Sequence, residues 1–129
     1  MPVNTVRALC ASLEAIEAEG LVRRIERHRA ISLLFRRRLV EMGLSVEAEL
    51  EFALPSVTVF RCPASVPAAA LRDWLSAHEG IFVATGLGRW QEDRIRVGHM
   101  GKNASPTTVE RLISAITRGL SELGPRVST

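Results

Sequence analysis

Apolar side chains recur at helical spacing in two consecutive runs over the first 43 residues. The first run follows Asn4, a residue type that can cap a helix, and Gly20 can end it. A second run starts at once, and Gly43 closes it. The apolar positions of the two runs are Val6, Leu9, Cys10, Leu13 and Ile16, then Leu21, Ile25, His28, Phe35, Leu39 and Met42. The pattern predicts two helices that meet at Gly20 as a long elbow.

Beyond Gly43 the period changes from helical to mostly alternating. Pro55–Arg61 is rich in β-branched residues, which favours a strand, and Ser105-Pro106 is a strong helix start. Apolar and polar residues alternate weakly at 44–47. The elements predicted beyond it are strands at 55–61, 81–84 and 94–98, a loop at 86–92, and helices over 67–79 and from 106 onward. The order of elements predicts an α+β fold, in which helices pack on a small, largely antiparallel sheet of three to four strands after a long helical elbow.

Composition narrows the class of protein. The chain has 129 residues, of which 47% are hydrophobic, and a formal net charge of +3, which fits one domain with a real core. Lys102 is the single lysine, so the basic residues are almost all arginine, a weak hint of anion binding. Cys10 and Cys62 lie in unlike settings and form neither a disulfide framework nor a metal site. With no membrane-length apolar run and no signal-peptide pattern, we expect a cytoplasmic protein without membrane contact.

The usual catalytic patterns are weak in this sequence. His28, His78 and His99 have no close His or Cys companions, so no metal site is predicted. We interpret His28, within an apolar stripe, as a packed histidine with a partner. The Gly86-Leu87-Gly88 loop has no helix following it to supply donors to a phosphate, so we read it as a hairpin connection.

Seven arginines on the second helical run raise the alternative of nucleic-acid binding. Glu26 and Glu41 interrupt the run, its charges spread over several faces, and the chain has no tyrosine. We therefore favour a solvated helix face and expect no nucleic-acid partner.

The stretch Asp93–Gly101 (DRIRVGHMG) carries two arginines two residues apart. Period two places Ile95 and Val97 on one face of a strand, with Arg94, Arg96 and Gly98 on the other. The pattern by itself favours arginines that face solvent. Gly98 points the other way, because glycine inside a strand often marks close approach of a ligand or another backbone.

Ile95–Gly101 (IRVGHMG), followed by Asn103-Ala104 and a Ser-Pro-capped helix, resembles the C-terminal segment of class V, fold-type I aminotransferases, which use pyridoxal phosphate. The sequence is most similar to the alanine–glyoxylate and serine–glyoxylate group. Further matching motifs occur in the same order at Pro2-Val3-Asn4, Glu19-Gly20-Leu21, Arg27-His28-Arg29, Leu54–Thr58 and Gly86-Leu87-Gly88. The likeness covers residues 2–124. It implies a single small domain over 1–129, with a linking helix at 1–20, a body at 21–124 and a tail at 125–129.

The resemblance implies that Arg96 grips the substrate α-carboxylate, since a guanidinium can make two parallel charge-assisted bonds to it. Arg94 has no such role by analogy, and we expect it to be solvated or paired. In the family, a lysine of the large domain holds the cofactor as a Schiff base, and Lys102 does not match that position. We expect no cofactor on this chain alone, no catalytic residue, and no transamination without a large domain.

Two interpretations of function remain open at this point. The first is the small domain of an aminotransferase for small amino acids with glyoxylate or a similar 2-oxo acid, as a fragment or as one half of a split enzyme with a large-domain partner. The alternative is a stand-alone relic module that binds a small carboxylate or a partner protein. In either case Val6, Leu9 and Leu13 would be partly uncovered, so we expect self-association and a homo-oligomer such as a dimer.

Overall fold

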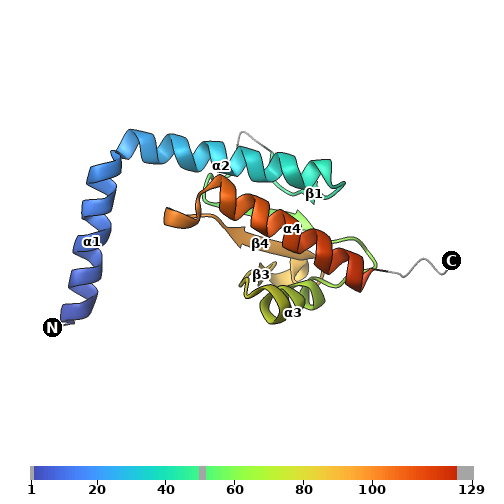
Figure 1. Cartoon of the computed structure of the whole chain (residues 1–129). Coiled ribbons are helices and arrows are strands. Elements are labelled where there is room, and N and C mark those ends of the chain that lie inside the picture. The colour runs from blue at the N-terminus through green and yellow to red at the C-terminus, as the bar shows by residue number, and fades with distance from the viewer. Residues whose placement is uncertain (1, 50–51, 125–129) are drawn as a thin grey trace.

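The computed structural model of the chain describes residues 2–49 and 52–124, so the predicted tail at 125–129 lies outside the described residues. Helices, strands and short 3-10 helices alternate through it (Figure 1). In chain order they are α1 (Val3–Glu19), α2 (Leu21–Glu41), β1 (Ser45–Val46), β2 (Val57–Arg61), α3 (Ala68–Glu79), β3 (Ala84–Thr85), η1 (Gly88–Trp90), β4 (Arg94–Gly98), η2 (Gly101–Asn103) and α4 (Pro106–Leu123).

One four-stranded sheet with the strand order β1-β2-β4-β3 organises the fold, and every neighbouring pair is antiparallel. The central pair is β2 with β4, in which Val59 lies opposite Arg96 and Phe60 opposite Ile95. The outer strands β1 and β3 have two residues each. The predicted α+β fold with a small antiparallel sheet is confirmed.

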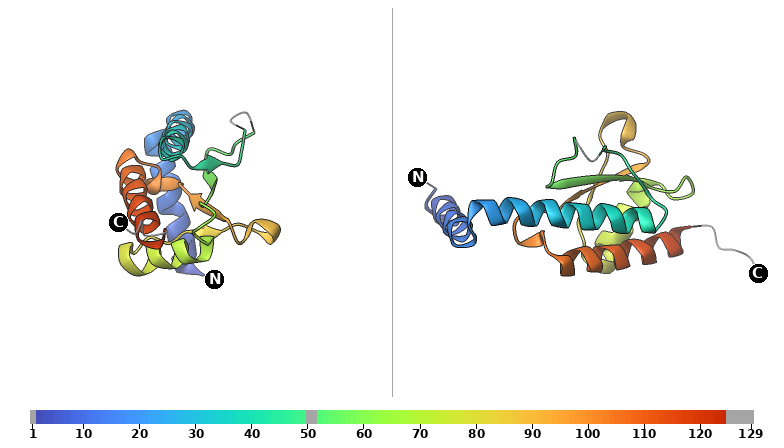
Figure 2. Two further views of the ribbon diagram at one scale, coloured as in Figure 1. Left: turned by 90° about the vertical axis from the view of Figure 1, so that its right-hand side faces the viewer. Right: turned by 90° about the horizontal axis from the view of Figure 1, so that it is seen from above.

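Helices α2, α3 and α4 all lie on one face of the sheet, as the end-on view in Figure 2 shows. The strands turn their apolar residues toward these helices, and the resulting core is closed to solvent. Its largest fully buried members are Phe35, Phe60, Leu39, Leu71, Leu75, Ile95 and Ile116. The opposite face of the sheet carries no helix among the described residues.

The ends of the helices follow from a few residues. Gly20, with φ +83°, separates α1 from α2, and Gly80, with φ +61°, ends α3 in the left-handed conformation that glycine tolerates best. Ser105 caps α4 as predicted, because its Oγ accepts the Thr108 N–H at 3.2 Å. The predicted Asn4 cap is wrong, since α1 begins at Val3, with Pro2 in the cap position.

Helix α1 runs away from the rest of the chain (Figure 1) and has no buried residue. Val6, Leu9 and Leu13 are 42%, 58% and 50% exposed, as the sequence led us to expect.

Two strand predictions need correction. The strand predicted at 55–61 begins at Val57, and the one predicted at 81–84 lies at Ala84–Thr85, with Phe82 exposed before it.

Candidate functional site

The two arginines of β4 lie on the face of the sheet opposite the helices. Ile95 and Val97 alternate with them and are buried on the helix side, as period two requires. Because β4 is an inner strand, its backbone is fixed on both sides, by β2 and by β3. The two guanidinium groups therefore start from a rigid backbone, and their surroundings decide what each can do.

Arg94 is buried and paired. It is 5% exposed, its Nε lies 3.0 Å from Glu47 Oε1, and it forms a second ion pair with Asp93. Burial acts to lower the pKa of Arg94, but the neighbouring Asp93 and Glu47 carboxylates raise it, and the net shift is upward. Of the two expectations for this residue, solvated or paired, the structure selects paired. Arg94 is occupied by its own chain.

Arg96 is partly buried and has a different set of contacts. Its Nε donates to the Thr85 carbonyl oxygen at 2.9 Å, which fixes the guanidinium plane relative to β3. Within residues 2–49 and 52–124, no carboxylate forms an ion pair with Arg96, and its two terminal nitrogens donate no hydrogen bond. The outer edge of the guanidinium, with two parallel N–H directions, is available to an anion.

The side chains opposite Arg96 in the two neighbouring strands are small or apolar. Val59 of β2 and Ala84 of β3 are its direct partners across the sheet, so both project on its side. Gly98 is exposed, and a Cβ placed there would meet the Met100 side chain at 3.5 Å, an ordinary contact distance. Val59, Ala84 and Gly98 are neutral and do not compensate the positive charge of Arg96, which favours a negatively charged ligand.

The loop between β3 and β4 packs against the start of β4 at Arg94. Gly86 donates its N–H to the Arg94 carbonyl oxygen at 2.8 Å, and a Cβ at Gly86 would lie 2.1 Å from the Trp90 carbonyl oxygen. The backbone therefore packs onto itself where only glycine fits. The loop joins two antiparallel strands, which confirms the hairpin connection predicted from sequence.

None of the three histidines forms a catalytic constellation. His28 has the structural partners that were predicted, and His78 stacks on Trp74 with ring centroids 4.8 Å apart. His99 is 3% exposed, bonds to Thr58 Oγ1 through Nε2 at 2.9 Å, and has its pKa lowered mainly by burial. Among the described residues, no three His, Cys, Asp or Glu side chains gather into a group that could hold a metal.

Helix α2 is less basic in three dimensions than in sequence. Arg24 and Arg27 pair with Glu19, and Arg38 pairs with Glu41 and Glu110. These carboxylates neutralise much of the charge that a nucleic-acid backbone would need.

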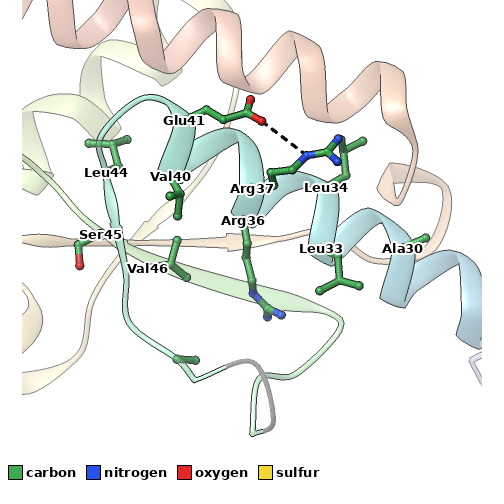
Figure 3. Close-up of a pocket in the computed structure, with 11 residues that line it drawn as sticks. Ala30, Leu33, Leu34, Arg36, Arg37, Val40, Glu41, Leu44, Ser45 and Val46 are labelled. Atoms are coloured by element: carbon green, nitrogen blue, oxygen red, sulfur yellow. Dashed lines mark ion pairs between the residues drawn. The ribbon is translucent and has the colours of Figure 1, made fainter.

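A hollow of about 940 Å³ lies between α2 and the segment that follows it (Figure 3), and Arg96 is not among the residues that line it. Its lining is mostly apolar and includes Leu33, Val40 and Val46. Arg36 borders it but is 6% exposed and donates through Nη2 to the Leu54 carbonyl oxygen at 2.7 Å. Burial lowers the pKa of Arg36. The sequence pattern does not distinguish Arg36 from the other arginines of α2, because its acceptors are backbone carbonyls that no residue pattern reveals.

The resemblance implies pyridoxal phosphate as the cofactor, which a lysine holds. Lys102 is the single lysine of the sequence, so its position shows whether this chain could hold that cofactor. This lysine is exposed in η2 and borders neither the hollow beside α2 nor a second hollow of about 880 Å³ beside η1. The residues present therefore do not fit the cofactor by themselves.

The described part of the chain also has no helix that is both long and apolar enough to span a membrane.

Known proteins match the chain along most of its length. It is 33% identical over 120 residues to alanine–glyoxylate aminotransferase of Oryctolagus cuniculus, covering 92% of this chain and 31% of that protein. It is 28% identical over 127 residues to pyridoxamine–pyruvate transaminase of Mesorhizobium japonicum, covering 98% of this chain and 32% of the relative. The chain thus spans about a third of the length of the curated relatives it matches.

Solved structures agree with the sequence matches. Alanine–glyoxylate aminotransferase from Nostoc sp. superposes with a TM-score of 0.89 at 34% identity, covering 92% of this chain and 32% of the other. Ureidoglycine–glyoxylate aminotransferase from Bacillus subtilis superposes with a TM-score of 0.82 at 25% identity, covering 90% and 30%. No protein-family model matches the chain. The chain is therefore a homologue of alanine–glyoxylate and related class V aminotransferases and has the fold of their C-terminal small domain.

Proposed function

We propose that the chain acts as the small domain of a pyridoxal-phosphate-dependent aminotransferase and that Arg96 binds the α-carboxylate of the substrate. The observation that carries this proposal is a guanidinium anchored through Nε on the Thr85 carbonyl, with no ion pair among the described residues. The name alanine–glyoxylate aminotransferase supports a small amino acid as donor and glyoxylate as acceptor, and the name pyridoxamine–pyruvate transaminase supports a similar 2-oxo acid as acceptor.

The geometry of Arg96 matches the task. Because Nε is already used, a carboxylate would meet the two terminal nitrogens end-on and form two parallel charge-assisted bonds. Such a pair fixes both the position and the plane of the carboxylate, which orients the α-carbon for reaction. Val59 and Ala84, opposite Arg96 in the two neighbouring strands, would border the carboxylate without competing for it.

The rest of the active site would come from a large domain, on the same polypeptide or on a separate one. Arg96 lies on a sheet face that no described helix covers, so a substrate held there would have protein on one side only. Lys102 lies at neither hollow, and we infer that the cofactor and the lysine that holds it belong to the missing wall. When bound, pyridoxal phosphate supplies the electron sink of the reaction.

A reconstitution experiment tests the proposal. The chain is mixed with a matching large-domain polypeptide, pyridoxal phosphate, an amino donor and glyoxylate, and transamination is followed. We expect activity to require the chain, and Arg96→Met to lower kcat/KM about a hundredfold or more, since charged hydrogen bonds contribute about 1.5–3 kcal/mol each. Arg61→Met is the matched control, because Arg61 lies on the same face but pairs with Asp93 at 3.2 Å.

Two results would overturn the proposal: activity that does not depend on the chain, or an Arg96→Met enzyme as active as the Arg61→Met control. The stand-alone alternative is tested separately by calorimetry of the isolated chain with glyoxylate and small amino acids. As a small domain, the chain would give almost no heat without its large domain. Measurable affinity that Arg96→Met abolishes would favour the relic carboxylate-binding module instead.

A further inference from the structure

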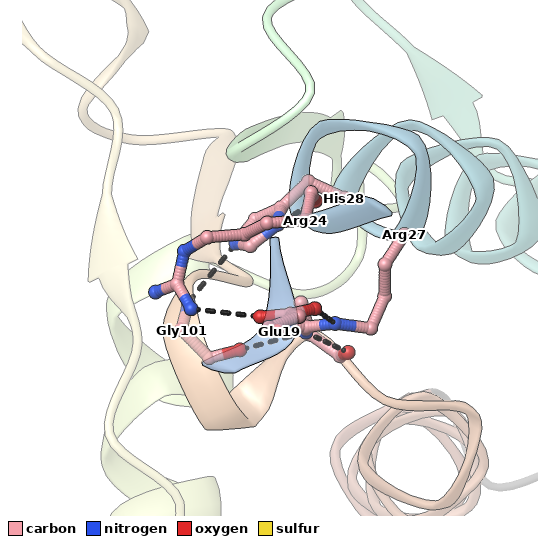
Figure 4. A network of polar contacts seen from close by, with 6 residues as sticks. Glu19, Arg24, Arg27, His28 and Gly101 are labelled. Atoms are coloured by element: carbon pink, nitrogen blue, oxygen red, sulfur yellow. Dashed lines mark hydrogen bonds and ion pairs between the residues drawn. The ribbon is translucent and has the colours of Figure 1, made fainter. Parts of the chain in front are cut away.

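A polar cluster at the elbow joins three parts of the chain that are far apart in sequence (Figure 4). Glu19 is the last residue of α1, and Gly20 separates it from α2. Glu19 Oε2 lies 2.9 Å from Arg24 Nη1, while Arg27 binds both carboxylate oxygens, with Nε at 2.5 Å from Oε1 and Nη2 at 2.9 Å from Oε2. The hydrogen bond from Arg27 is the main reason that the pKa of Glu19 falls to about 2.

The same arginine holds the turn that follows β4. Arg27 Nη1 donates to the Gly101 carbonyl oxygen at 2.9 Å and to the Ala104 carbonyl oxygen at 2.7 Å. Ala104 is fully buried and directly precedes Ser105, the cap of α4. One planar guanidinium therefore connects the end of α1 to the segment between β4 and α4, from its place on α2.

His28, one residue further along α2, completes the hold on this turn. Its Nδ1 lies 2.7 Å from the Arg24 carbonyl oxygen, and its Nε2 accepts the Gly101 N–H at 3.1 Å. Nδ1 therefore carries the proton and Nε2 is the acceptor. Both polar groups of Gly101 are bound by α2, the oxygen by Arg27 and the nitrogen by His28. Gly101 has φ +59°, so its conformation also depends on being glycine.

The cluster has a consequence for α1. This helix buries no residue, so tertiary packing does little to set its direction. Its direction is fixed at the elbow, where Glu19 is bonded to Arg27, which also binds Gly101, five positions after Arg96. An ordinary surface ion pair joins two side chains and contributes little, whereas here one side chain serves two segments at once.

We propose that Glu19, Arg27 and His28 form a latch that couples the direction of α1 to the turn ending the Arg96 strand. Docking of α1 against another protein surface would then stabilise the turn, and loosening the turn would free α1. The coupling is a property of this chain alone. Its consequence for substrate binding, through the position of Arg96, rests on the proposed function.

Amide hydrogen exchange measured by NMR on the isolated chain tests one direction of the coupling. We expect Glu19→Gln to speed exchange at Gly101 and Ala104 at least about tenfold, although Glu19 contacts neither residue. Arg27→Lys should do the same, because an ammonium group cannot span the carboxylate and both carbonyls. Glu110→Gln, which weakens the Arg38–Glu110 pair between α2 and α4, is the matched control and should leave these amides within about twofold.

The effect of the turn on α1 is tested with a dye attached to Cys10 on α1. Cys10 is exposed, whereas Cys62 is buried and its thiol pKa is raised to about 11, mainly by burial, so a thiol-reactive dye selects Cys10. Coupling is reciprocal, so His28→Ala, which removes one hydrogen bond to the turn, should lower the time-resolved anisotropy of the dye, and Glu19→Gln should lower it as well.

The outcomes separate cleanly. Faster exchange at Gly101 in Glu19→Gln, together with greater dye motion in His28→Ala, supports the latch, provided that amides in the core of α4 keep their protection. If Glu19→Gln frees α1 without changing Gly101, or if Arg27→Lys behaves like the wild type, Glu19 and Arg27 form a plain surface pair and the proposal is wrong. Neither readout needs cofactor or substrate, so this result is independent of the reconstitution.

Discussion

Replacing Thr58 with valine would remove one buried hydrogen bond behind the Arg96 strand while keeping the shape of the side chain. Thr58 is 1% and His99 3% exposed, and the bond between Oγ1 and Nε2 is 2.9 Å long. Nδ1 of His99 is buried and has no partner among the described residues, so the substitution would leave both ring nitrogens unpaired. Stranding a buried polar group costs about 1–3 kcal/mol, and no cavity adds to it because valine fills the space. We expect the free energy of unfolding to fall by about 2 kcal/mol.

Urea denaturation at pH 8, followed by circular dichroism, measures this loss. With a slope of about 1–3 kcal/mol per molar urea, the midpoint should fall by about 1 M at an unchanged slope. Thr58→Ser keeps the hydroxyl and removes one methyl group, so it should cost about 1 kcal/mol. Thr107→Val changes an exposed threonine of α4 and should stay within about 0.5 kcal/mol of the wild type.

The comparison can fail in a clear way. If Thr58→Val is as stable as the wild type, or more stable than Thr58→Ser, the bond to His99 does not stabilise the fold. The buried pair would then be dispensable, and the position of β4 would depend on apolar packing alone.

Three further changes test other contacts. Burial lowers the pKa of His99 in the folded chain, so this histidine binds a proton more readily in the unfolded chain. The free energy of unfolding should therefore fall as the pH drops from 7 toward 5, and it should fall more steeply in the wild type than in His99→Gln. Gly119→Ala puts a Cβ 2.9 Å from the Trp74 ring between α3 and α4. It should lower the free energy of unfolding by about 1–2 kcal/mol, although alanine is a better helix former than glycine. An unchanged free energy of unfolding would show that the two helices can shift to accommodate the methyl group. Calorimetric scanning should show a Tm several degrees lower for Arg94→Met, which removes the arginine paired with Glu47 and one of the two arginines paired with Asp93. For Arg96→Met the Tm should stay near the wild-type value, and equal shifts would contradict the different roles assigned to the two arginines.

The fold was largely predictable because local signals agree with it. Glycines end the helices where the sequence places them, and the serine–proline start of α4 is capped as expected. The strand β3 begins later than predicted for a local reason that the hydrophobic pattern does not show. Ile81 donates its N–H back to the Leu75 carbonyl oxygen at 3.1 Å, so it completes the end of α3, and the strand begins at Ala84.

The site was predictable in part. Period two gives the face on which Arg94 and Arg96 lie, but it cannot say what covers either of them. Arg94 is buried by Glu47, 47 positions earlier in the chain, and by the turn at Gly86. Arg96 differs because its acceptor is a backbone carbonyl, which leaves its charge without a partner among the described residues. Such long-range contacts depend on the sheet register, which the sequence pattern does not specify.

The two-residue outer strands affect how the protein would aggregate. A long, flat edge exposes a row of unpaired N–H and C=O groups on which a strand of another molecule can be added, as in amyloid fibrils. Here β1 and β3 each end after two residues, so a foreign strand finds very few free backbone groups at either edge. Association through the apolar side chains of α1 should therefore give soluble helical assemblies, and the sheet should not seed fibrils that bind thioflavin T.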